Sequence, residues 1–252
     1  MRVGNSTRGC ENAFVPGYVV HERELEGTRV NGDTASTTTT IDASVGCQNL
    51  EQRVLRFAPG RSQARSVGAS QEVMYVASGR GTVLVDGRAH DIEPDTGVYI
   101  APGETYEVEN PGPDELVIVS ATAPGENDGA LPEDRTVRFV DQPVLPASPD
   151  REFRYLVTQA VGCRDMTQFV GTIPPGRAPD HSHVYDEIVY VVEGEGMLHI
   201  GEESTPIAAG SCIHLPPLLA HCLENTGPGP MRVMGVFHPA GDPASRAPEP
   251  NQ

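Results

Sequence analysis

The chain repeats its own sequence pattern. Residues 45–47 (Val-Gly-Cys) recur as residues 161–163, at an offset of 116 positions. Farther along, residues 72–76 (Glu-Val-Met-Tyr-Val) recur in similar form as residues 187–191 at an offset of 115, because the first copy carries one extra residue. This second register then holds without a gap as far as residue 228. A register kept over about seventy residues indicates duplication, so the chain must fold as two copies of one unit.

Each copy has the pattern of a β structure. Gly and Pro account for 27 and 23 of the 252 residues. They separate runs rich in Val, Ile and Tyr, about five residues long, at the spacing typical of sandwiches and barrels. Asp86-Gly87 is a signal for a tight hairpin between two such runs. This density of turn residues excludes a helix bundle or coiled coil, and we predict an all-β chain with two tandem barrels.

The parts of the chain outside the repeat are rich in polar residues, Pro and Gly. The N-terminal arm, which ends in four threonines, is expected to have limited structure, and the Pro-rich tail is expected to be disordered. The predicted segments are the arm at 1–44, an N-terminal barrel at 45–124, a linker with one short strand at 125–159, a C-terminal barrel at 160–240 and the tail at 241–252.

Composition excludes several classes of function. The net charge is −17, which opposes binding to nucleic acid or to an anionic membrane. All 18 basic residues are arginines, so Schiff-base chemistry, a lysine-bound pyridoxal cofactor and a Walker A phosphate site are excluded. The five cysteines form no C-x-x-C pair, the start of the chain has no apolar leader, and no segment approaches the roughly 20 apolar residues of a membrane helix. We expect a soluble cytoplasmic protein.

The second copy contains a set of metal-ligand residues. His181 and His183 are two residues apart, so on an extended segment both imidazoles face the same side. Glu187 follows four residues later, and His221 comes from a separate strand that can complete the set. Three imidazoles and one carboxylate suit a divalent ion of the middle transition series and leave coordination positions open. We therefore predict one metal ion per chain, bound by these four residues.

These residues resemble the two motifs of the cupin family of small jelly-roll barrels, G-x5-H-x-H-x3,4-E-x6-G and G-x5-P-x-G-x2-H-x3-N. The second copy matches both His, the Glu and the closing Gly of the first motif, and the Pro, His and Asn of the second. It departs in having four residues between Gly176 and His181, and Leu218 at the usual Gly. The first copy keeps the turn residues, but its ligand positions hold Ser66, Gly68 and Tyr106. The resemblance implies a bicupin whose single metal centre lies in the C-terminal barrel.

The resemblance implies a mononuclear metal enzyme that acts on a small oxygenated organic molecule. An Fe(II) dioxygenase is the favoured function. Redox-neutral isomerase, lyase, decarboxylase or hydrolase chemistry with Mn(II), Zn(II) or Ni(II), and a non-catalytic small-molecule-binding bicupin, are the alternatives. Glu187 is the expected catalytic proton carrier. The chain is expected to be a monomer or a homodimer.

Candidate substrate contacts at the barrel mouth follow from strand parity alone. They are Gln168, Met197, His199 and Arg232. For His199, a contact within the barrel wall is an equal alternative. A slip of one residue in any strand would turn its candidate to the other face of the sheet.

Overall fold

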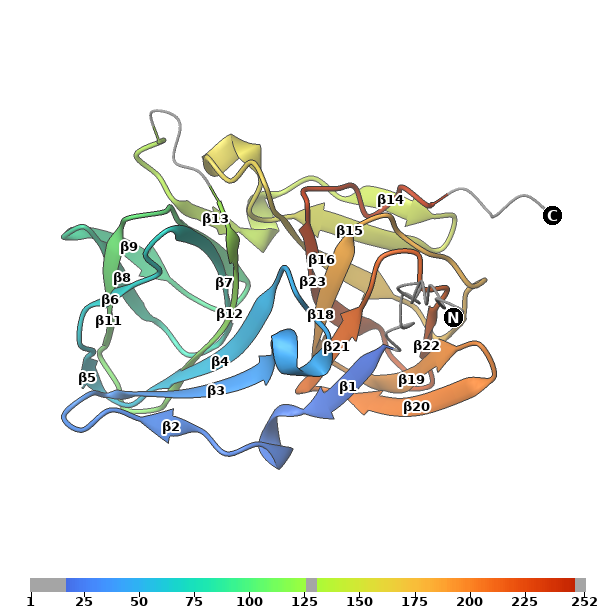
Figure 1. The fold of residues 1–252 in the computed structure, drawn as a ribbon, viewed down its shortest axis with the longest axis horizontal. Coiled ribbons are helices and arrows are strands. Elements are labelled where there is room, and N and C mark those ends of the chain that lie inside the picture. Colours follow the sequence, from blue (N-terminus) through green and yellow to red (C-terminus); the bar gives the residue numbers. More distant parts are fainter. Residues whose placement is uncertain (1–16, 126–130, 248–252) are drawn as a thin grey trace, which may run out of the picture.

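The computed structural model describes residues 17–125 and 131–247, which form two β-barrels side by side (Figure 1). Within these ranges the helices are four short 3-10 turns, η1 (Glu22–Glu24), η2 (Ala43–Val45), η3 (Phe139–Asp141) and η4 (Gln159–Val161), and none could cross a membrane. The prediction of an all-β chain with two barrels is therefore confirmed.

The N-terminal barrel consists of a seven-stranded sheet packed against a smaller one. The order of the large sheet is β13-β10-β7-β12-β4-β3-β2, and that of the small sheet is β5-β11-β8-β9, with β6 paired to β11. The strands are β2 (Thr28–Arg29), β3 (Ala35–Ile41), β4 (Glu51–Phe57), β5 (Gly60–Arg61), β6 (Arg65–Ser66), β7 (Ser70–Ser78), β8 (Gly81–Val85), β9 (Arg88–Ile92), β10 (Thr96–Ile100), β11 (Thr105–Asn110), β12 (Leu116–Pro124) and β13 (Thr136–Arg138).

The C-terminal barrel repeats this arrangement. Its large sheet has the order β1-β21-β18-β23-β16-β15-β14, and its small sheet has the order β17-β22-β19-β20. The strands are β1 (Tyr18–His21), β14 (Leu145–Ser148), β15 (Arg151–Tyr155), β16 (Thr167–Ile173), β17 (Gly176–Arg177), β18 (Asp186–Glu193), β19 (Glu195–Ile200), β20 (Glu203–Ala208), β21 (Ser211–Leu215), β22 (Cys222–Asn225) and β23 (Met231–His238).

The two barrels exchange their leading strands. Strand β1 precedes the N-terminal barrel in sequence but pairs with β21 of the C-terminal barrel, while β13 precedes the C-terminal barrel but pairs with β10 of the N-terminal barrel. The pairing is equivalent in the two cases, because His21 lies opposite Ser211 and Arg138 lies opposite Thr96. Each short strand covers the edge of a partner sheet that would otherwise expose unpaired backbone groups.

The arm and the linker therefore differ from what their composition suggested. Limited structure was expected in the arm, but its described part forms β1, β2 and β3. The threonine run at residues 37–40 lies within β3, where β-branched side chains are favoured and one face of the strand is open to solvent. The linker holds three strands, β13 to β15, in place of the one expected. Residues 1–16 and 126–130 lie outside the described part of the chain.

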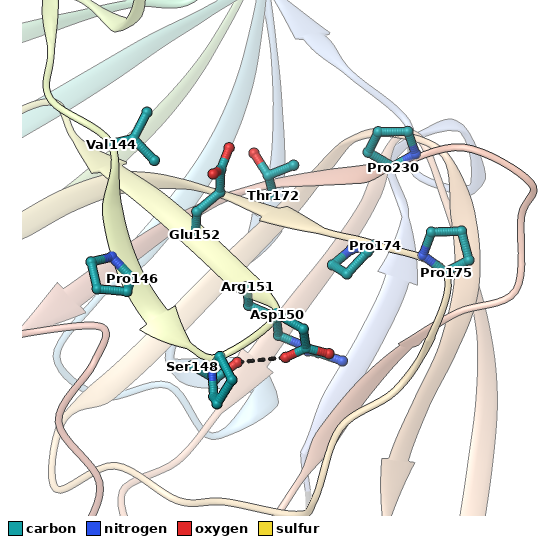
Figure 2. A pocket seen from close by; sticks show the side chains of 11 residues that line it. Val144, Pro146, Ser148, Asp150, Arg151, Glu152, Thr172, Pro174, Pro175 and Pro230 are labelled. Atoms are coloured by element: carbon teal, nitrogen blue, oxygen red, sulfur yellow. Dashed lines mark hydrogen bonds between the residues drawn. The ribbon is translucent and has the colours of Figure 1, made fainter.

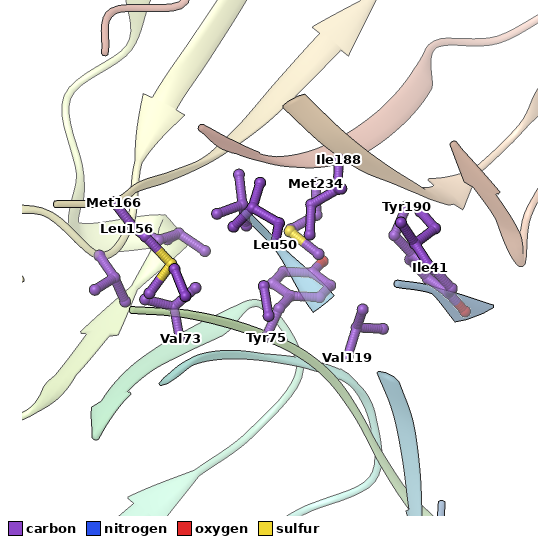
Figure 3. Close-up of a cluster of buried hydrophobic side chains, with 14 of the residues drawn as sticks. Ile41, Leu50, Val73, Tyr75, Val119, Leu156, Met166, Ile188, Tyr190 and Met234 are labelled. Carbon is purple, nitrogen blue, oxygen red and sulfur yellow. The ribbon is translucent and has the colours of Figure 1, made fainter. Parts of the chain in front are cut away.

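Alternation along the central strands separates a core between the barrels from a core inside each barrel. In β7, Met74 and Val76 face the interior of their own barrel, whereas Val73 and Tyr75 face the other barrel. The equivalent residues of β18 divide in the same way, with Ile188 on the shared face. Figure 3 shows side chains of both barrels meeting there. Equivalent faces of the two copies thus pack on each other and form the shared core between the barrels.

The beginning of the C-terminal tail packs on the second barrel. The backbone N–H of Gly241 donates to the Thr167 hydroxyl at 3.1 Å, and the N–H of Ala247 donates to the Ser182 carbonyl at 2.8 Å. The expected disorder of 241–252 therefore does not extend to residues 241–247, because backbone hydrogen bonds hold this segment. Residues 248–252 lie outside the described part.

A buried asparagine closes the same turn in both copies. The Asn225 side-chain N–H₂ donates to the carbonyls of Ile173 and Gly229, both at 2.8 Å, and its oxygen accepts from the Gly227 N–H at 2.9 Å. Asn110 makes the equivalent three bonds in the first copy, each at 2.8 Å. The asparagine of the second motif is thus a structural residue that joins the two sheets of each barrel.

This geometry predicts matched losses of stability. Asn110→Ala and Asn225→Ala should each lower the free energy of unfolding by about 2–4 kcal/mol, because each leaves buried backbone groups without a partner. Asn31→Ala, at an exposed position where only the backbone carbonyl accepts a bond from Gln63, is the control and should change stability little. Urea unfolding of the metal-free proteins measures the effect, and a loss below about 1 kcal/mol for either asparagine would contradict it.

Candidate metal centre

The four residues predicted as ligands converge at one end of the C-terminal barrel. His181 and His221 face each other across an isolated antiparallel bridge, with each backbone N–H donating to the other's carbonyl at 2.9 Å. His183 lies two residues after His181, and Glu187 is the second residue of β18. One ligand nitrogen from each histidine lies within 4.8 Å of the others. The Glu187 Oε2 atom lies 4.0 Å from His183 Nε2 and 3.8 Å from His221 Nε2.

The donor atoms suit a metal ion. Two ligands that share one ion through bonds of about 2.0–2.2 Å lie about 3–4 Å apart, close to the separations seen here. Glu187 Oε2 is buried without a hydrogen-bond partner, although it faces two imidazoles. His221 Nδ1 lies 2.9 Å from the Leu219 carbonyl. A proton on Nδ1 satisfies that contact and leaves the Nε2 lone pair free for a ligand role.

The turn before His221 explains the departure from the usual second motif. Leu218 has a φ of +65°, and Gly103 at the equivalent position of the first copy has a φ of +84°. A leucine in the left-handed region costs about 1–2 kcal/mol relative to ordinary backbone, whereas glycine adopts it freely. The Leu218 N–H donates to the His183 carbonyl at 2.7 Å, which ties this strained turn to the ligand loop. The missing glycine thus changes the strain of the turn and not its shape.

Burial controls the protonation of the metal-free site. It lowers the pKa values of all three histidines, that of His221 to about 4, and the positive charge of Arg246 lowers them further. The same burial raises the pKa of Glu187 to about 8. At neutral pH the free site therefore contains neutral imidazoles, which is the form that binds metal, together with a protonated carboxyl group.

A cavity of about 90 Å³ adjoins the ligands. Its walls are mostly apolar and include Phe153, Phe169 and Phe237, which also pack on one another. Pro243 and Arg246 of the tail line the same cavity. The cavity therefore has room for a small ligand beside the four residues.

Two of the predicted substrate contacts point away from this cavity. Gln168 is buried at the face between the barrels, where its side-chain oxygen lies beside Gly97. Arg232 pairs with Asp95 of the other barrel at 2.7 Å. The strand neighbours Phe169 and Val233 line the cavity instead. The parity assumed for β16 and β23 was off by one residue, and a shift of one residue turns a side chain to the other face of the sheet.

The other two predicted contacts lie on the outer face of β19. Met197 lines a surface groove between β1 and β20. His199 contacts the Ser204 hydroxyl and the Glu224 carboxylate, both at 2.7 Å, so it belongs to the barrel wall. Their shared neighbour Leu198 takes the core-facing position. None of the four predicted contacts therefore lines the cavity beside the ligands.

Among the residues that line the cavity but were not predicted from the sequence are two that could have been predicted and two that could not. Phe169 and Val233 are one residue from predicted contacts, so the correct parity would have identified them. Arg151 and Arg246, which also line the cavity, fall in segments expected to be linker and tail. Arg151 lies at the start of β15, beside a separate outer groove of about 480 Å³ lined by several prolines (Figure 2). No periodic pattern marked either arginine.

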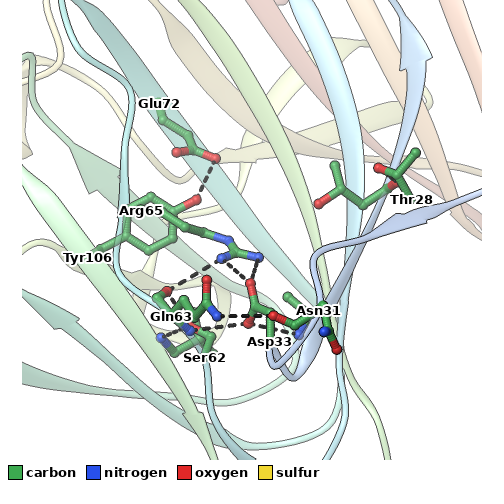
Figure 4. Close-up of polar contacts among 11 residues, drawn as sticks. Thr28, Asn31, Asp33, Ser62, Gln63, Arg65, Glu72 and Tyr106 are labelled. Carbon is green, nitrogen blue, oxygen red and sulfur yellow. Dashed lines mark hydrogen bonds and ion pairs between the residues drawn. The ribbon is translucent and has the colours of Figure 1, made fainter.

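The interior of the N-terminal barrel replaces the ligands with hydrogen bonds. Glu72, equivalent to Glu187, accepts bonds from the hydroxyls of Ser120 and, at 3.4 Å, Tyr106 (Figure 4). Tyr106 occupies the position equivalent to His221 and is buried in the barrel core. Burial raises the pKa of Glu72. Among the described residues of this interior, there is no group of potential metal ligands like the three histidines near Glu187.

A second cluster of titratable groups lies between the barrels. Cys47, Asp186 and His214 are all buried within 4.8 Å of one another. The Asp186 carboxylate is already satisfied by His214 Nε2 at 2.7 Å and by the Asn49 side-chain N–H₂ at 2.9 Å. Burial raises the pKa of the Cys47 thiol to about 12, so the thiolate form needed for metal binding is disfavoured. The cluster is a hydrogen-bonded link between the barrels.

Comparison with known proteins agrees with this architecture. The family model described as "Cupin_2: Cupin domain" matches residues 53–122 and 169–237. Auxin-binding protein 1 of Arabidopsis thaliana is 31% identical over 86 residues, which cover 30% of this chain and 43% of that protein. The chain spans about half the length of the curated relatives that it matches.

Solved structures resemble the whole two-barrel arrangement. A glyoxylate-induced protein from Pseudomonas aeruginosa superposes with a TM-score of 0.76 at 18% identity and covers 92% of this chain and 93% of that one. Oxalate decarboxylase from Bacillus subtilis superposes with a TM-score of 0.71 at 14% identity and covers 88% of this chain and 76% of that one. The family match extends over more than half of the sequence and falls once in each barrel, as the predicted resemblance required. The chain belongs to the cupin family and carries two cupin domains in tandem.

Proposed function

We propose that the protein is a metal-dependent enzyme that converts a small oxygenated organic molecule at one site in the C-terminal barrel. The observation that carries the proposal is the convergence of three histidines and Glu187 on a cavity of about 90 Å³. His181, His183, His221 and Glu187 would hold one divalent ion. When bound, the ion supplies Lewis acidity that polarises a carbonyl or similar group of the substrate. Among the structural neighbours, oxalate decarboxylase is an enzyme by name, which agrees with a catalytic role.

Glu187 is the residue that we assign to proton transfer. Its Oε2 atom is buried, faces the cavity end where the imidazoles meet, and has no hydrogen-bond partner. In the metal-free protein burial raises the pKa of Glu187 to about 8, and as a deprotonated ligand the same carboxylate would accept a proton from the substrate.

We rank redox-neutral chemistry above oxygen chemistry. The positive charge of the Arg246 guanidinium lowers the pKa of all three histidines. The same positive charge opposes oxidation of a bound metal ion, because oxidation adds positive charge to the site. The same charge stabilises negative charge that develops on a substrate oxygen. This electrostatic environment favours isomerase, lyase, decarboxylase or hydrolase chemistry with Mn(II), Zn(II), Ni(II) or Fe(II).

An Fe(II) dioxygenase is the second candidate. The walls formed by Phe153, Phe169 and Phe237 favour it, because an apolar cavity admits dioxygen readily.

Metal content tests the site directly. Protein purified without added metal should contain one divalent ion per chain, and His181→Ala with His221→Ala should lower metal affinity at least tenfold, since each removes a ligand. Tyr106→Phe in the other barrel is the control and should leave metal content unchanged. Elemental analysis decides, and two ions per chain or full occupancy in the double variant would contradict the assignment.

Metal loading should release a proton. At pH 7 the Glu187 carboxyl, with its pKa raised to about 8, carries a proton in the metal-free protein and must lose it to become a ligand. We expect release of close to one proton per ion at pH 7, falling toward zero above pH 9, and none in Glu187→Gln. Calorimetric titration in buffers of different ionisation enthalpy measures this number. Equal release by the wild-type protein and the variant would show that Glu187 is not the source.

Oxygen dependence separates the two reaction classes. Once a substrate is found by screening, turnover should proceed equally fast under nitrogen and in air, and Glu187→Gln should lower kcat by about 10²–10⁴-fold. An oxygen electrode and product analysis provide the measurement. Stoichiometric oxygen consumption would replace the redox-neutral assignment with the dioxygenase. Reversible ligand binding without any conversion would leave only a binding protein.

A further inference from the structure

Two arginines share the cavity with the candidate metal ligands. Arg151 comes from the start of β15, and Arg246 comes from the C-terminal tail. Apart from these arginines and the ligands, the cavity walls are largely aromatic and aliphatic. Arg246 is exposed at the rim of the cavity, whereas Arg151 is partly buried and loses part of its hydration, a loss that is unfavourable unless an anion compensates it.

Arg151 has unused donor capacity. One terminal nitrogen donates to the Leu223 carbonyl at 2.9 Å, and this bond holds the guanidinium against β22. Its Nε atom is buried and has no hydrogen-bond partner. Burial lowers the pKa of Arg151, and the positive charge of Arg246 lowers it further. The two side chains are therefore near enough to repel each other.

Arg246 is held in place by the tail. The hydrogen bonds of Gly241 to Thr167 and of Ala247 to Ser182 fix the segment on both sides of it, and the second anchor lies between His181 and His183. Among the residues that the structure describes, neither Arg246 nor Arg151 forms an ion pair.

The neighbouring carboxylates form no ion pair with either arginine, although the negative charge of Asp150 opposes part of the lowering of the Arg151 pKa. Asp150 accepts a bond from the Ser148 hydroxyl at 2.8 Å. Asp180 pairs with Arg177 at 3.3 Å. Glu152 lines the cavity too, but it is exposed and also lines the outer groove, where Figure 2 shows its carboxylate. Two cations thus border a small cavity with no paired counter-charge.

We infer that Arg151 and Arg246 form a subsite for a carboxylate of the substrate. This inference rests on the proposed function and narrows its substrate class to small carboxylic acids. The two guanidiniums bind the carboxylate, and a second oxygen or nitrogen of the same molecule faces the three histidines. A space of about 90 Å³ beside the ligands suits a small acid.

The test compares a carboxylate with an uncharged molecule of the same shape. Propionate and propionamide are titrated at pH 7 into the metal-loaded and the metal-free protein, and binding is followed by ligand-observed NMR. Propionate should bind at least tenfold more tightly than propionamide to the wild-type protein. Arg246→Gln and Arg151→Gln should each remove most of this preference, while Arg246→Lys keeps part of it because the charge remains.

Arg80→Gln is the matched control. Arg80 pairs with Glu93 on the surface of the other barrel, and its side chain is 73% exposed. It should leave propionate affinity unchanged. Equal binding of propionate and propionamide by the wild-type protein, no binding of propionate, or an unchanged preference in Arg246→Gln would each overturn the inference. If Arg151→Gln does not fold, Arg246→Gln decides alone, because the tail lies outside the barrel.

The titration of the metal-free protein separates this inference from the proposed function. If no preparation binds a divalent ion but the charge preference depends on the two arginines, the proposed function fails and the carboxylate subsite stands. If the ion binds and a substrate turns over, but the arginine variants behave like the wild-type protein, the subsite fails and the metal enzyme stands.

Discussion

Strand β18 separates two environments, and the position of the candidate metal centre depends on this separation. Its alternate residues Ile188 and Tyr190 are buried against the other barrel, and burial of a large apolar side chain contributes about 1.5–3 kcal/mol. Glu187 lies on the opposite face of the same strand and therefore points into the barrel. The apolar contact between barrels thus fixes the strand from which the one carboxylate ligand projects.

The fold and the ligands could be predicted because they depend on local spacing. A repeat register reports the duplicated barrel directly, and His181 and His183 lie on one side because an extended chain alternates. The substrate face could not be predicted in the same way. The side on which Gln168 and Arg232 lie depends on where the alternation of each strand starts, and no sequence pattern marks that start. Arg151 and Arg246 reach the site through tertiary packing of segments that have no periodicity.

The equivalent glutamates of the two barrels have different surroundings. Glu72 and Glu187 are both buried acids on equivalent strands. What differs is the residue opposite, since Tyr106 donates a hydrogen bond to Glu72 where His221 presents an unshared nitrogen pair toward Glu187. A tyrosine fills the space and, with Ser120, hydrogen-bonds one oxygen of the acid, Oε1, while Oε2 stays buried without a partner, so the first barrel is a packed core. A histidine instead places a ring nitrogen 3.8 Å from the unpartnered Oε2 of Glu187, and this pair of atoms is part of the candidate metal site.

The exchange of leading strands sets the order in which the chain completes its structure. His21 makes a 3.0 Å contact with the Ala209 carbonyl, 188 residues away in sequence, so the partner of β1 is synthesised long after β1 itself. Contacts of such separation form late, because closing a large loop costs entropy before any contact repays it. The earliest described strand to leave the ribosome is thus among the last to be docked. If the chain were cut just before β13, the C-terminal half would lack β1, which covers β21, and the N-terminal half would lack β13, which covers β10.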